Sequence, residues 1–306
     1  MKFLFWLEKL RFPGLNECML AVTRLGEETA FLVLALIIFW CVDKYQGYYM
    51  LGVGLFGNMA NQFVKILCRV PRPWVKAPEL TVLGNAKEAA AGYSFPSGHS
   101  QTAVGTFGCI SVSQKSKLLR SICIAVMLLV PFSRMYLGVH TPADVIVGSL
   151  MALAMVFALK PVFFQRDGKY IPLYFVVMFA LSIGYVLFVE LYPFGELVDA
   201  HNYASAVKNG YMFLGCFVGV LTVYYVDEKK LQFPVKAVWW AQIIKAMLGL
   251  AVVLAVKEGT RGTLESLFSG HMLSRAVRYY LVVVVAGIVW PLTFRWFSKL
   301  GKKTAQ

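Results

Sequence analysis

Apolar residues in this chain fall in runs of about 20, separated by short polar segments. A helix of that length crosses the hydrocarbon core of a bilayer, because it rises about 1.5 Å per residue through a layer about 30 Å thick. The runs are too continuous for the strands of a barrel, the other fold that satisfies its backbone in lipid. The pattern therefore predicts an all-α, polytopic transmembrane helical bundle. We expect about nine spans, at residues 22–42, 47–67, 98–114, 119–139, 142–163, 171–192, 205–226, 235–256 and 278–298.

The connections between these runs indicate one membrane domain. Two connections are long, at 68–97 and 257–277, and no internal repeat or soluble linker interrupts the series. We divide the domain into a catalytic membrane core, residues 1–195, which holds the polar motifs, and a C-terminal transmembrane extension, residues 196–306. Residues 3–11 are expected to lie on the membrane surface.

Composition and charge support a membrane protein. Hydrophobic residues make up 58% of the 306 positions and the mean hydropathy is +0.64, above the values of soluble domains. The net charge of +14 comes from basic residues scattered between apolar runs, which argues against nucleic-acid binding and favours loop charges near anionic lipid. Loops opposite the polar motifs carry slightly more Lys and Arg, so the positive-inside rule favours an active site facing out of the cytoplasm.

The second run carries a polar stripe. Asn58, Asn61, Gln62 and Lys65 stand at i, i+3, i+4 and i+7, so they share one face of a helix. Such a face cannot point into lipid, and we expect it to point into the bundle. Arg72 follows between two prolines that stop the helix and stiffen the backbone. Taken alone, the two cations are better explained as basic residues that snorkel to lipid headgroups.

Pro96-Ser97-Gly98-His99 opens the third run. Proline and serine suit a helix start, and glycine leaves room for an anion to reach the free amides of the first turn. The helix dipole adds to the attraction. The segment thus predicts an anion site with a proton donor beside it. A capped helix with an interfacial histidine explains the same tetrapeptide nearly as well.

A third polar group combines with the first two. His140 and Asp144 are spaced i, i+4 at the start of a helix, so the carboxylate can hold one imidazole nitrogen while the other stays free to attack. Arg134 comes six residues before His140, at the end of the preceding span. Histidine–aspartate pairs are common, but a pair with an arginine ahead of it, a second histidine and two further cations is not. Together these residues suit the binding and cleavage of a phosphate ester, and the apolar chain suggests a lipid-bound phosphate.

These three segments resemble the signature of the type 2 phosphatidic-acid phosphatase (PAP2) superfamily: Lys-x6-Arg-Pro, Pro-Ser-Gly-His and Ser-Arg-x5-His-x3-Asp. All three parts are present in order and with intact spacing, at Lys65–Pro73, Pro96–His99 and Ser133–Asp144. The resemblance covers about residues 15–160. Within the family, Leu25-Gly-Glu-Glu28 and residues 133–140 look most like sphingosine-phosphate phosphatases and their bacterial relatives.

The resemblance implies a role for each site residue. His140 would attack phosphorus and form a phosphohistidine, Asp144 would fix the tautomer of His140, and His99 would protonate the leaving alkoxide and then activate water. The phosphate oxygens would be held by Lys65, Arg72, Ser97, Gly98 and Arg134. Protein cations would replace a metal, so we expect no metal ion or other cofactor.

The implied function is hydrolysis of a lipid phosphate monoester or pyrophosphate in a membrane, most simply a bacterial plasma membrane. A phosphotransferase with the same intermediate, a vanadium-dependent haloperoxidase and a non-enzymatic lipid-binding or transport protein remain as alternatives. The haloperoxidases are soluble, unlike this chain. Phosphatidate, a sphingoid-base phosphate, a polyprenyl pyrophosphate and phosphatidylglycerol phosphate all fit as substrates. The bilayer and the lipid are the expected partners, and the oligomeric state is not predicted.

Lys245 stands near the middle of the predicted span 235–256. A charge at that depth costs about 2.5 to 3.5 kcal/mol on insertion scales, so we expect the ammonium to face the bundle interior and to find a partner. Trp239 and Trp240 resemble an interfacial belt and support this placement. The alternative is a lysine at a span end whose boundary lies a turn or two away.

Overall fold

The computed structural model describes residues 1–88, 90, 92–165, 168–194 and 198–300. Its described elements are helical, with no strand among them, as the all-α prediction requires. The chain forms two compact units, each assembled from separate stretches of sequence. The first unit comprises Met1–Leu32, Tyr49–Pro161 and Tyr192–Ala206, and the second comprises Val33–Tyr48, Val162–Leu191 and Val207–Gln306.

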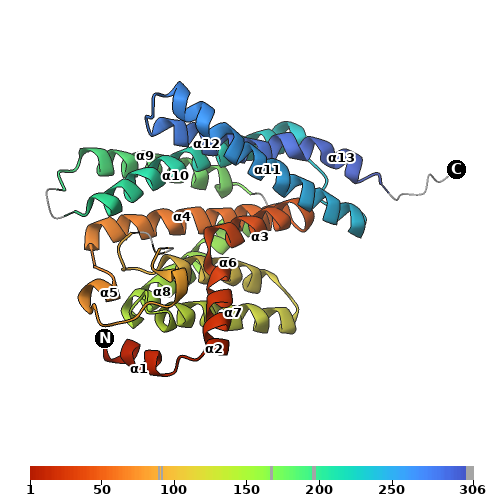
Figure 1. Cartoon of the computed structure of the whole chain (residues 1–306). Coiled ribbons are helices and arrows are strands. Elements are labelled where there is room, and N and C mark those ends of the chain that lie inside the picture. Colours follow the sequence, from red (N-terminus) through yellow and green to blue (C-terminus); the bar gives the residue numbers. More distant parts are fainter. Residues whose placement is uncertain (89, 91, 166–167, 195–197, 301–306) are drawn as a thin grey trace. The chain divides into compact units, whose positions relative to one another are not determined.

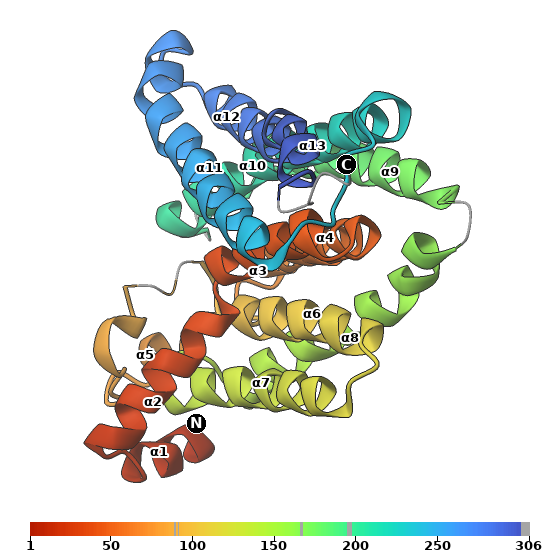
Figure 2. The same ribbon diagram turned by 90° about the vertical axis from the view of Figure 1, so that its right-hand side faces the viewer.

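The first unit contains most of the N-terminal helices. They are α1 (Lys2–Lys9), α2 (Pro13–Thr23), η1 (Arg24–Gly26), α4 (Lys44–Cys68, from Tyr49 on), α5 (Pro73–Lys76), η2 (Gly84–Ala86), α6 (Gly98–Ser113), α7 (Lys117–Tyr136) and most of α8 (Pro142–Phe164). Helices α6, α7 and α8 lie side by side (Figure 2). Hydroxyl caps set two of their starts: Ser97 Oγ accepts from the amide of Ser100, and Ser116 Oγ accepts from the amide of Leu119.

The second unit contains the C-terminal helices (Figure 1). They are α9 (Tyr170–Leu191), most of α10 (Ala200–Val226), η4 (Asp227–Leu231), α11 (Trp239–Leu267), α12 (Leu273–Val284), η5 (Val285–Val289), η6 (Trp290–Thr293) and α13 (Phe294–Phe297). Most of α3 (Glu28–Cys41), from the N-terminal part of the chain, also belongs to this unit. Helices α10 and α12 pack closely at two glycines four residues apart. A Cβ atom at Gly215 would collide with the carbonyl of Ala276, and one at Gly219 would lie 2.7 Å from Val283 Cβ. Small residues of this kind let helices approach in lipid.

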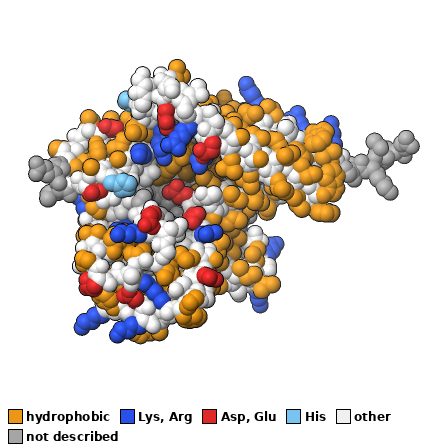
Figure 3. All heavy atoms as spheres, in the orientation of Figure 1, with side chains coloured by type: hydrophobic (Ala, Val, Ile, Leu, Met, Phe, Trp, Pro, Cys, Tyr) orange, Lys and Arg blue, Asp and Glu red, His pale blue; other side chains and the backbone are white. Residues whose placement is uncertain are grey.

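Six described segments are long and apolar enough to cross a membrane: Lys117–Tyr136, Pro142–Phe164, Tyr170–Leu191, Ala200–Leu231, Trp239–Leu267 and Leu273–Phe297. Helix α3 is apolar but shorter. Hydrophobic side chains dominate the visible surface over α11 and α13, as expected of helices that face lipid (Figure 3). Each of the predicted spans overlaps a described helix, so the polytopic bundle is confirmed. Helices α4 and α6, which carry polar motifs, are not among these segments, and α6 has only 16 residues.

The predicted span 22–42 is not one helix. Helix α2 ends at Thr23, a 3-10 turn covers Arg24–Gly26, and α3 begins at Glu28. The break occurs where the chain passes close to the start of α6. A Cβ atom at Gly26 would lie 2.8 Å from the carbonyl oxygen of His99 and 2.7 Å from Val130, so only glycine fits this crossing.

The predicted connection 257–277 is also wrong, because α11 continues as a helix to Leu267. Its last turns are polar, and the sequence pattern suggested a loop. Beyond the apolar part of the helix such residues can stay exposed, and Arg261 and Glu265 form an i, i+4 ion pair at 3.2 Å. The helix begins at Trp239, four residues later than the predicted start, after non-helical backbone that includes Pro234.

Lys245 is fully buried, as predicted. Its Nζ atom donates to the carbonyl of Val235 at 2.9 Å and lies 4.4 Å from the ring centroid of Phe294. The lysine therefore joins α11 to the segment before it and to α13, all within the second unit. The prediction of an inward-facing lysine with a partner is confirmed, and that partner belongs to the extension itself.

Lys245→Met should lower the thermal stability of the protein in detergent. The carbonyl of Val235 would keep the Gln242 Nε2 donor at 3.0 Å but lose the charged donor at 2.9 Å, and a hydrogen bond to a charged group contributes about 1.5 to 3 kcal/mol. We expect a fall in Tm, measured by thermal unfolding. Lys236→Met is the matched control, because Lys236 is exposed, and its Tm should be unchanged. Equal Tm values for both variants would contradict a structural role for Lys245.

Candidate active site

The polar stripe on α4 points into the first unit, as predicted. Asn58, Asn61 and Lys65 are buried, and Gln62 is partly buried. Because the surrounding helices cover these side chains, none of the three buried residues is exposed to lipid. The interpretation of Lys65 as a residue that snorkels to headgroups is therefore wrong.

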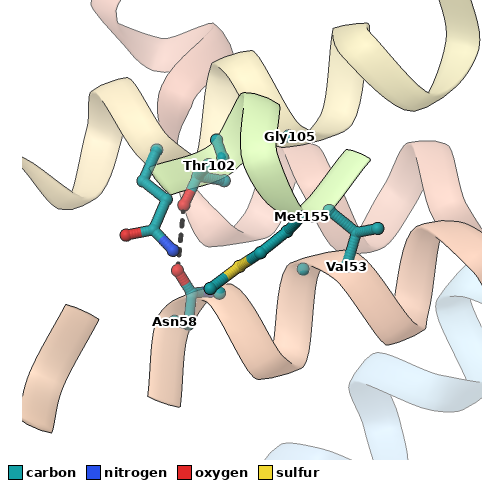
Figure 4. Close-up of a pocket in the computed structure, with 9 residues that line it drawn as sticks. Val53, Asn58, Thr102, Gly105 and Met155 are labelled. Atoms are coloured by element: carbon teal, nitrogen blue, oxygen red, sulfur yellow. Dashed lines mark hydrogen bonds between the residues drawn. The ribbon is translucent and has the colours of Figure 1, made fainter. Parts of the chain in front are cut away.

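Two side-chain hydrogen bonds join α4 to α6. Thr102 Oγ1 donates to Asn58 Oδ1 at 3.1 Å, and Asn61 Nδ2 donates to Gln101 Oε1 at 2.7 Å. Figure 4 shows the first of these bonds beside a small pocket, which is also lined by Met155 of α8. Buried polar pairs of this kind set a unique register between helices. The end of α4 is thereby held against the first turns of α6.

Lys65 and Arg72 are anchored by backbone carbonyls. Lys65 Nζ donates to the carbonyl of Tyr93 at 2.6 Å. Arg72 donates through Nε to Gly92 at 3.0 Å and through a terminal nitrogen to Val139 at 3.2 Å. Neutral acceptors orient the two cations without cancelling their charge. Both residues are buried, at 5% and 7% exposure.

Arg134 is the third buried cation. A terminal nitrogen of its guanidinium lies 2.8 Å from Thr23 Oγ1, while its Nε is buried and has no hydrogen-bond partner among the described residues. Arg134 is held at the end of α7, as the sequence predicted. Among the described residues of the first unit, three buried cations thus accompany one buried carboxylate, that of Asp144. Buried charges of one sign are costly unless they are paired, so this arrangement favours binding of an anion.

His140 lies between a cation and a carboxylate. A terminal nitrogen of Arg72 is 2.9 Å from His140 Nε2, and His140 Nδ1 is 3.6 Å from Asp144 Oδ2. A guanidinium can only donate hydrogen bonds, so Nε2 must offer its lone pair. The neutral ring therefore carries its proton on Nδ1, the nitrogen on the Asp144 side. This tautomer follows from the Arg72 contact and leaves the lone pair of the ring on Nε2.

Asp144 is fixed by two donors that the sequence analysis missed. Its Oδ2 accepts from Ser94 Oγ at 2.6 Å and from the amide of Thr141 at 2.7 Å. In return the amide of Asp144 donates to Thr141 Oγ1 at 3.4 Å. Thr141 and Asp144 thus form a capping box at the start of α8, and the Thr-Pro-Ala-Asp spacing was the signal for it. Ser94 gave no such signal, because its partner stands fifty positions away.

The start of α6 is tied to the start of α8. The amide of Ser97 donates to the backbone carbonyl of Asp144 at 2.9 Å, and Ser97 Oγ also accepts from Ser100 Oγ at 2.8 Å. Gly98 is the first residue of the helix, followed by His99. The side chain of His99 is partly buried and has no hydrogen-bond partner among the described residues. The start of α6 therefore brings together the Ser97 cap, the amide of Gly98 and the imidazole of His99.

Burial and the neighbouring cations hold the pKa of His140 well below its usual value of 6.5. Among these cations Arg72 lowers the pKa most, ahead of Arg134 and Lys65, and His99 adds to the lowering. Burial also lowers the pKa of Arg72 to about 10, against the opposing effect of Asp144. At neutral pH the site therefore combines a neutral imidazole with a charged guanidinium.

The fold and the site define an integral-membrane protein in which buried cations suited to bind an anion lie beside two histidines. Comparison with known proteins gives its family. The PAP2 superfamily profile matches residues 45–168, and the profile described as "PAP2 superfamily phosphatase, transmembrane extension" matches residues 211–303. The chain belongs to the PAP2 superfamily and is a membrane phosphatase of that family.

One curated relative is phosphatidylglycerophosphatase B of Bacillus subtilis (strain 168). It is 31% identical over 164 residues, which cover 49% of this chain and 76% of the relative. The crystal structure of a transmembrane PAP2-type phosphatidylglycerolphosphate phosphatase from Bacillus subtilis is 27% identical. It aligns with a TM-score of 0.45 over 54% of this chain and 85% of that chain.

Thermal stability should fall as the pH drops below 6.5, in part because of His140. The folded-state pKa lies below the ordinary value of 6.5, so in this interval the unfolded chain binds a proton that the folded protein does not. The stability linked to neutral His140 is complete above the ordinary pKa and declines toward the folded-state pKa, by at most about 1.4 kcal/mol per pH unit.

The measurement is Tm in detergent for the wild type and His140→Gln, from about pH 8 to about pH 5. The wild type should lose more stability over this range, because the glutamine variant lacks the titrating ring. Curves that stay parallel across the range would show that His140 titrates normally in the folded protein.

Proposed function

We propose that the protein is a lipid-phosphate phosphatase that works through a phosphohistidine on His140 and without a metal ion. The observation that carries this proposal is the contact of 2.9 Å between Arg72 and His140 Nε2. It identifies a neutral nitrogen whose lone pair points toward a cation suited to bind the phosphoryl group. The same guanidinium can bind a phosphate oxygen when substrate replaces the imidazole as its acceptor.

The proposed reaction has two transfers. His140 Nε2 attacks phosphorus while the bond to the lipid oxygen breaks, and His99 gives its proton to the departing alkoxide. Asp144 stabilises the imidazolium that forms, since its carboxylate faces Nδ1. Water then attacks the phosphohistidine, His99 takes the proton from this water, and His140 leaves as a neutral ring. Inorganic phosphate is released.

The cations supply the charge stabilisation that phosphoryl transfer requires. Lys65, Arg72 and Arg134 would hold the equatorial oxygens, with the Ser97 hydroxyl and the Gly98 amide. Three observations support these roles: the three cations are buried, carbonyls rather than carboxylates orient Lys65 and Arg72, and Nε of Arg134 has no partner among the described residues.

The substrate we favour is a phosphate monoester on a glycerolipid headgroup, because the curated relative is named a phosphatidylglycerophosphatase. A sphingoid-base phosphate and a lipid pyrophosphate fit the same site. We place the protein in a bacterial plasma membrane with the active site facing out of the cytoplasm, on the basis of the loop charges. The catalytic core at residues 1–195 and the extension at residues 196–306 are consistent with profile matches on either side of this boundary.

The direct test is phosphate release by purified protein from a panel of lipid phosphates, with a chelator present. Hydrolysis should continue in chelator and should be blocked by vanadate, which mimics five-coordinate phosphorus. Loss of activity in chelator with recovery on adding magnesium would contradict the metal-free mechanism. Turnover only when an acceptor alcohol is added would favour a phosphotransferase, and no turnover at all would favour a lipid-binding protein.

His99→Ala should affect substrates according to their leaving group. An alkyl phosphate needs a proton on the departing oxygen, so kcat/KM should fall by about 10² to 10⁴. An aryl phosphate with an acidic leaving group should lose far less, whereas His140→Ala should abolish turnover of both. If His99→Ala reduces both substrates equally, His99 positions the phosphate and does not donate the proton.

A further inference from the structure

The first two turns of helix α12 carry two arginines that have no partner of opposite charge among the described residues. Arg278 is 7% exposed, and the Nε atoms of Arg275 and Arg278 are both buried without a hydrogen-bond partner among the described residues. Neither guanidinium takes part in an ion pair among the described residues. The contact that each guanidinium does make is with the ring of Tyr279, at 5.7 and 5.3 Å from its centroid.

The acidic and polar groups near this helix end have other partners. Glu190, at the end of α9, is hydrogen-bonded to Tyr211 of α10. The ring of Tyr211 lies 6.1 Å from that of His271, whose Nδ1 accepts from the amide of Leu273 at the start of α12. On α11, Glu258 and Glu265 pair with Lys257 and Arg261. Within the part of the chain that the structure describes, the two arginines are thus left without a counter-ion.

The dipole of α12 makes the position of these two arginines less favourable. Arg275 and Arg278 lie in the first two turns of α12, near the positive end of the helix dipole. Cations are normally favoured at the opposite end. Two guanidiniums and a helix N-terminus in one place create a positive field that an anion would relieve. The close packing of Ala276 on Gly215 also holds the first turn of α12 in place, so the site is ordered before a ligand binds.

The depth of this site indicates which anion it meets. Leu273–Phe297 is long and apolar enough to cross a membrane, and the arginines lie near its first residue, at the level of the lipid headgroups. Tyr279 and Tyr280 follow directly and suit an interfacial aromatic belt. The anionic group most abundant at that level is the phosphate of a phospholipid, which arginine binds with two parallel hydrogen bonds.

We propose that Arg275 and Arg278 form a second phosphate-binding site, which holds the headgroup of an anionic membrane lipid and does not cleave it. The site is built from residues of the second unit, whereas the residues proposed for catalysis all belong to the first unit. It gives the transmembrane extension a function of its own: to retain an anionic lipid on the protein. This proposal does not depend on the reaction at His140.

The test measures the thermal stability of delipidated protein in detergent as phosphatidylglycerol, phosphatidylcholine or inorganic phosphate is added. Phosphatidylglycerol should raise the Tm of the wild type more than phosphatidylcholine does. In the double variant Arg275→Gln/Arg278→Gln the midpoint of this response should shift to a lipid concentration higher by about tenfold or more, because hydrogen bonds to charged groups are lost. Hydrolysis of a water-soluble phosphate ester should be unchanged.

Two control variants locate the effect. Arg72→Gln removes a cation of the catalytic site, and Lys257→Gln removes an exposed charge from α11; both should respond to phosphatidylglycerol as the wild type does. A response lost only in Arg72→Gln would overturn the proposal by placing the lipid at the catalytic site. An unchanged response in the double variant would overturn it as well, and a response to inorganic phosphate alone would overturn the choice of a lipid.

The variant Arg275→Lys/Arg278→Lys distinguishes a loss of lipid binding from a folding defect in the double glutamine variant. This variant keeps both charges, but it loses the paired hydrogen bonds of the guanidinium. It should fold and retain a weaker preference for phosphatidylglycerol over phosphatidylcholine. A lysine variant with no preference for the anionic lipid would contradict the role of positive charge at this site.

Discussion

The site depends first on the carboxylate of Asp144. One of its oxygens accepts hydrogen bonds from Ser94 and from the amide of Thr141, and the same oxygen faces His140. Its backbone carbonyl accepts from the amide of Ser97. A single residue therefore connects the start of α8, the start of α6 and the segment before α6. This junction fixes the position of His140 relative to the first turn of α6.

The second constraint is the burial of three cations in an apolar bundle. In the first unit the hydrogen-bond acceptors of these cations are uncharged: Lys65 and Arg72 donate to backbone carbonyls, and Arg134 contacts a hydroxyl. Carbonyl dipoles lessen the desolvation penalty of a cation but leave its charge in place. Carboxylates in direct contact with these cations would neutralise their charge, and they would compete with phosphate. The protein thus keeps a site whose charge is balanced best when an anion is present.

The helices and the motif residues were predictable from sequence because their signals are local. Apolar runs near 20 residues mark spans, and the spacing from Lys65 to Asp144 carries the PAP2 signature. What was missed depends on partners that are remote in sequence. Ser94 became meaningful only opposite Asp144, and the break at Gly26 only against the backbone of His99. The extra turns of α11 were missed because polar residues continue a helix once it has left the apolar layer.

In the proposed mechanism, the contact between Arg72 and His140 also controls when Nε2 can attack. The lone pair of Nε2 is shielded by a guanidinium nitrogen at 2.9 Å. A neutral electrophile has no means of drawing the guanidinium away, whereas an incoming phosphate offers it a stronger acceptor and so uncovers the nitrogen. In that mechanism the negative charge of the substrate itself makes Nε2 accessible. Reactivity and selectivity for anions then have one origin, a single hydrogen bond that must change partners.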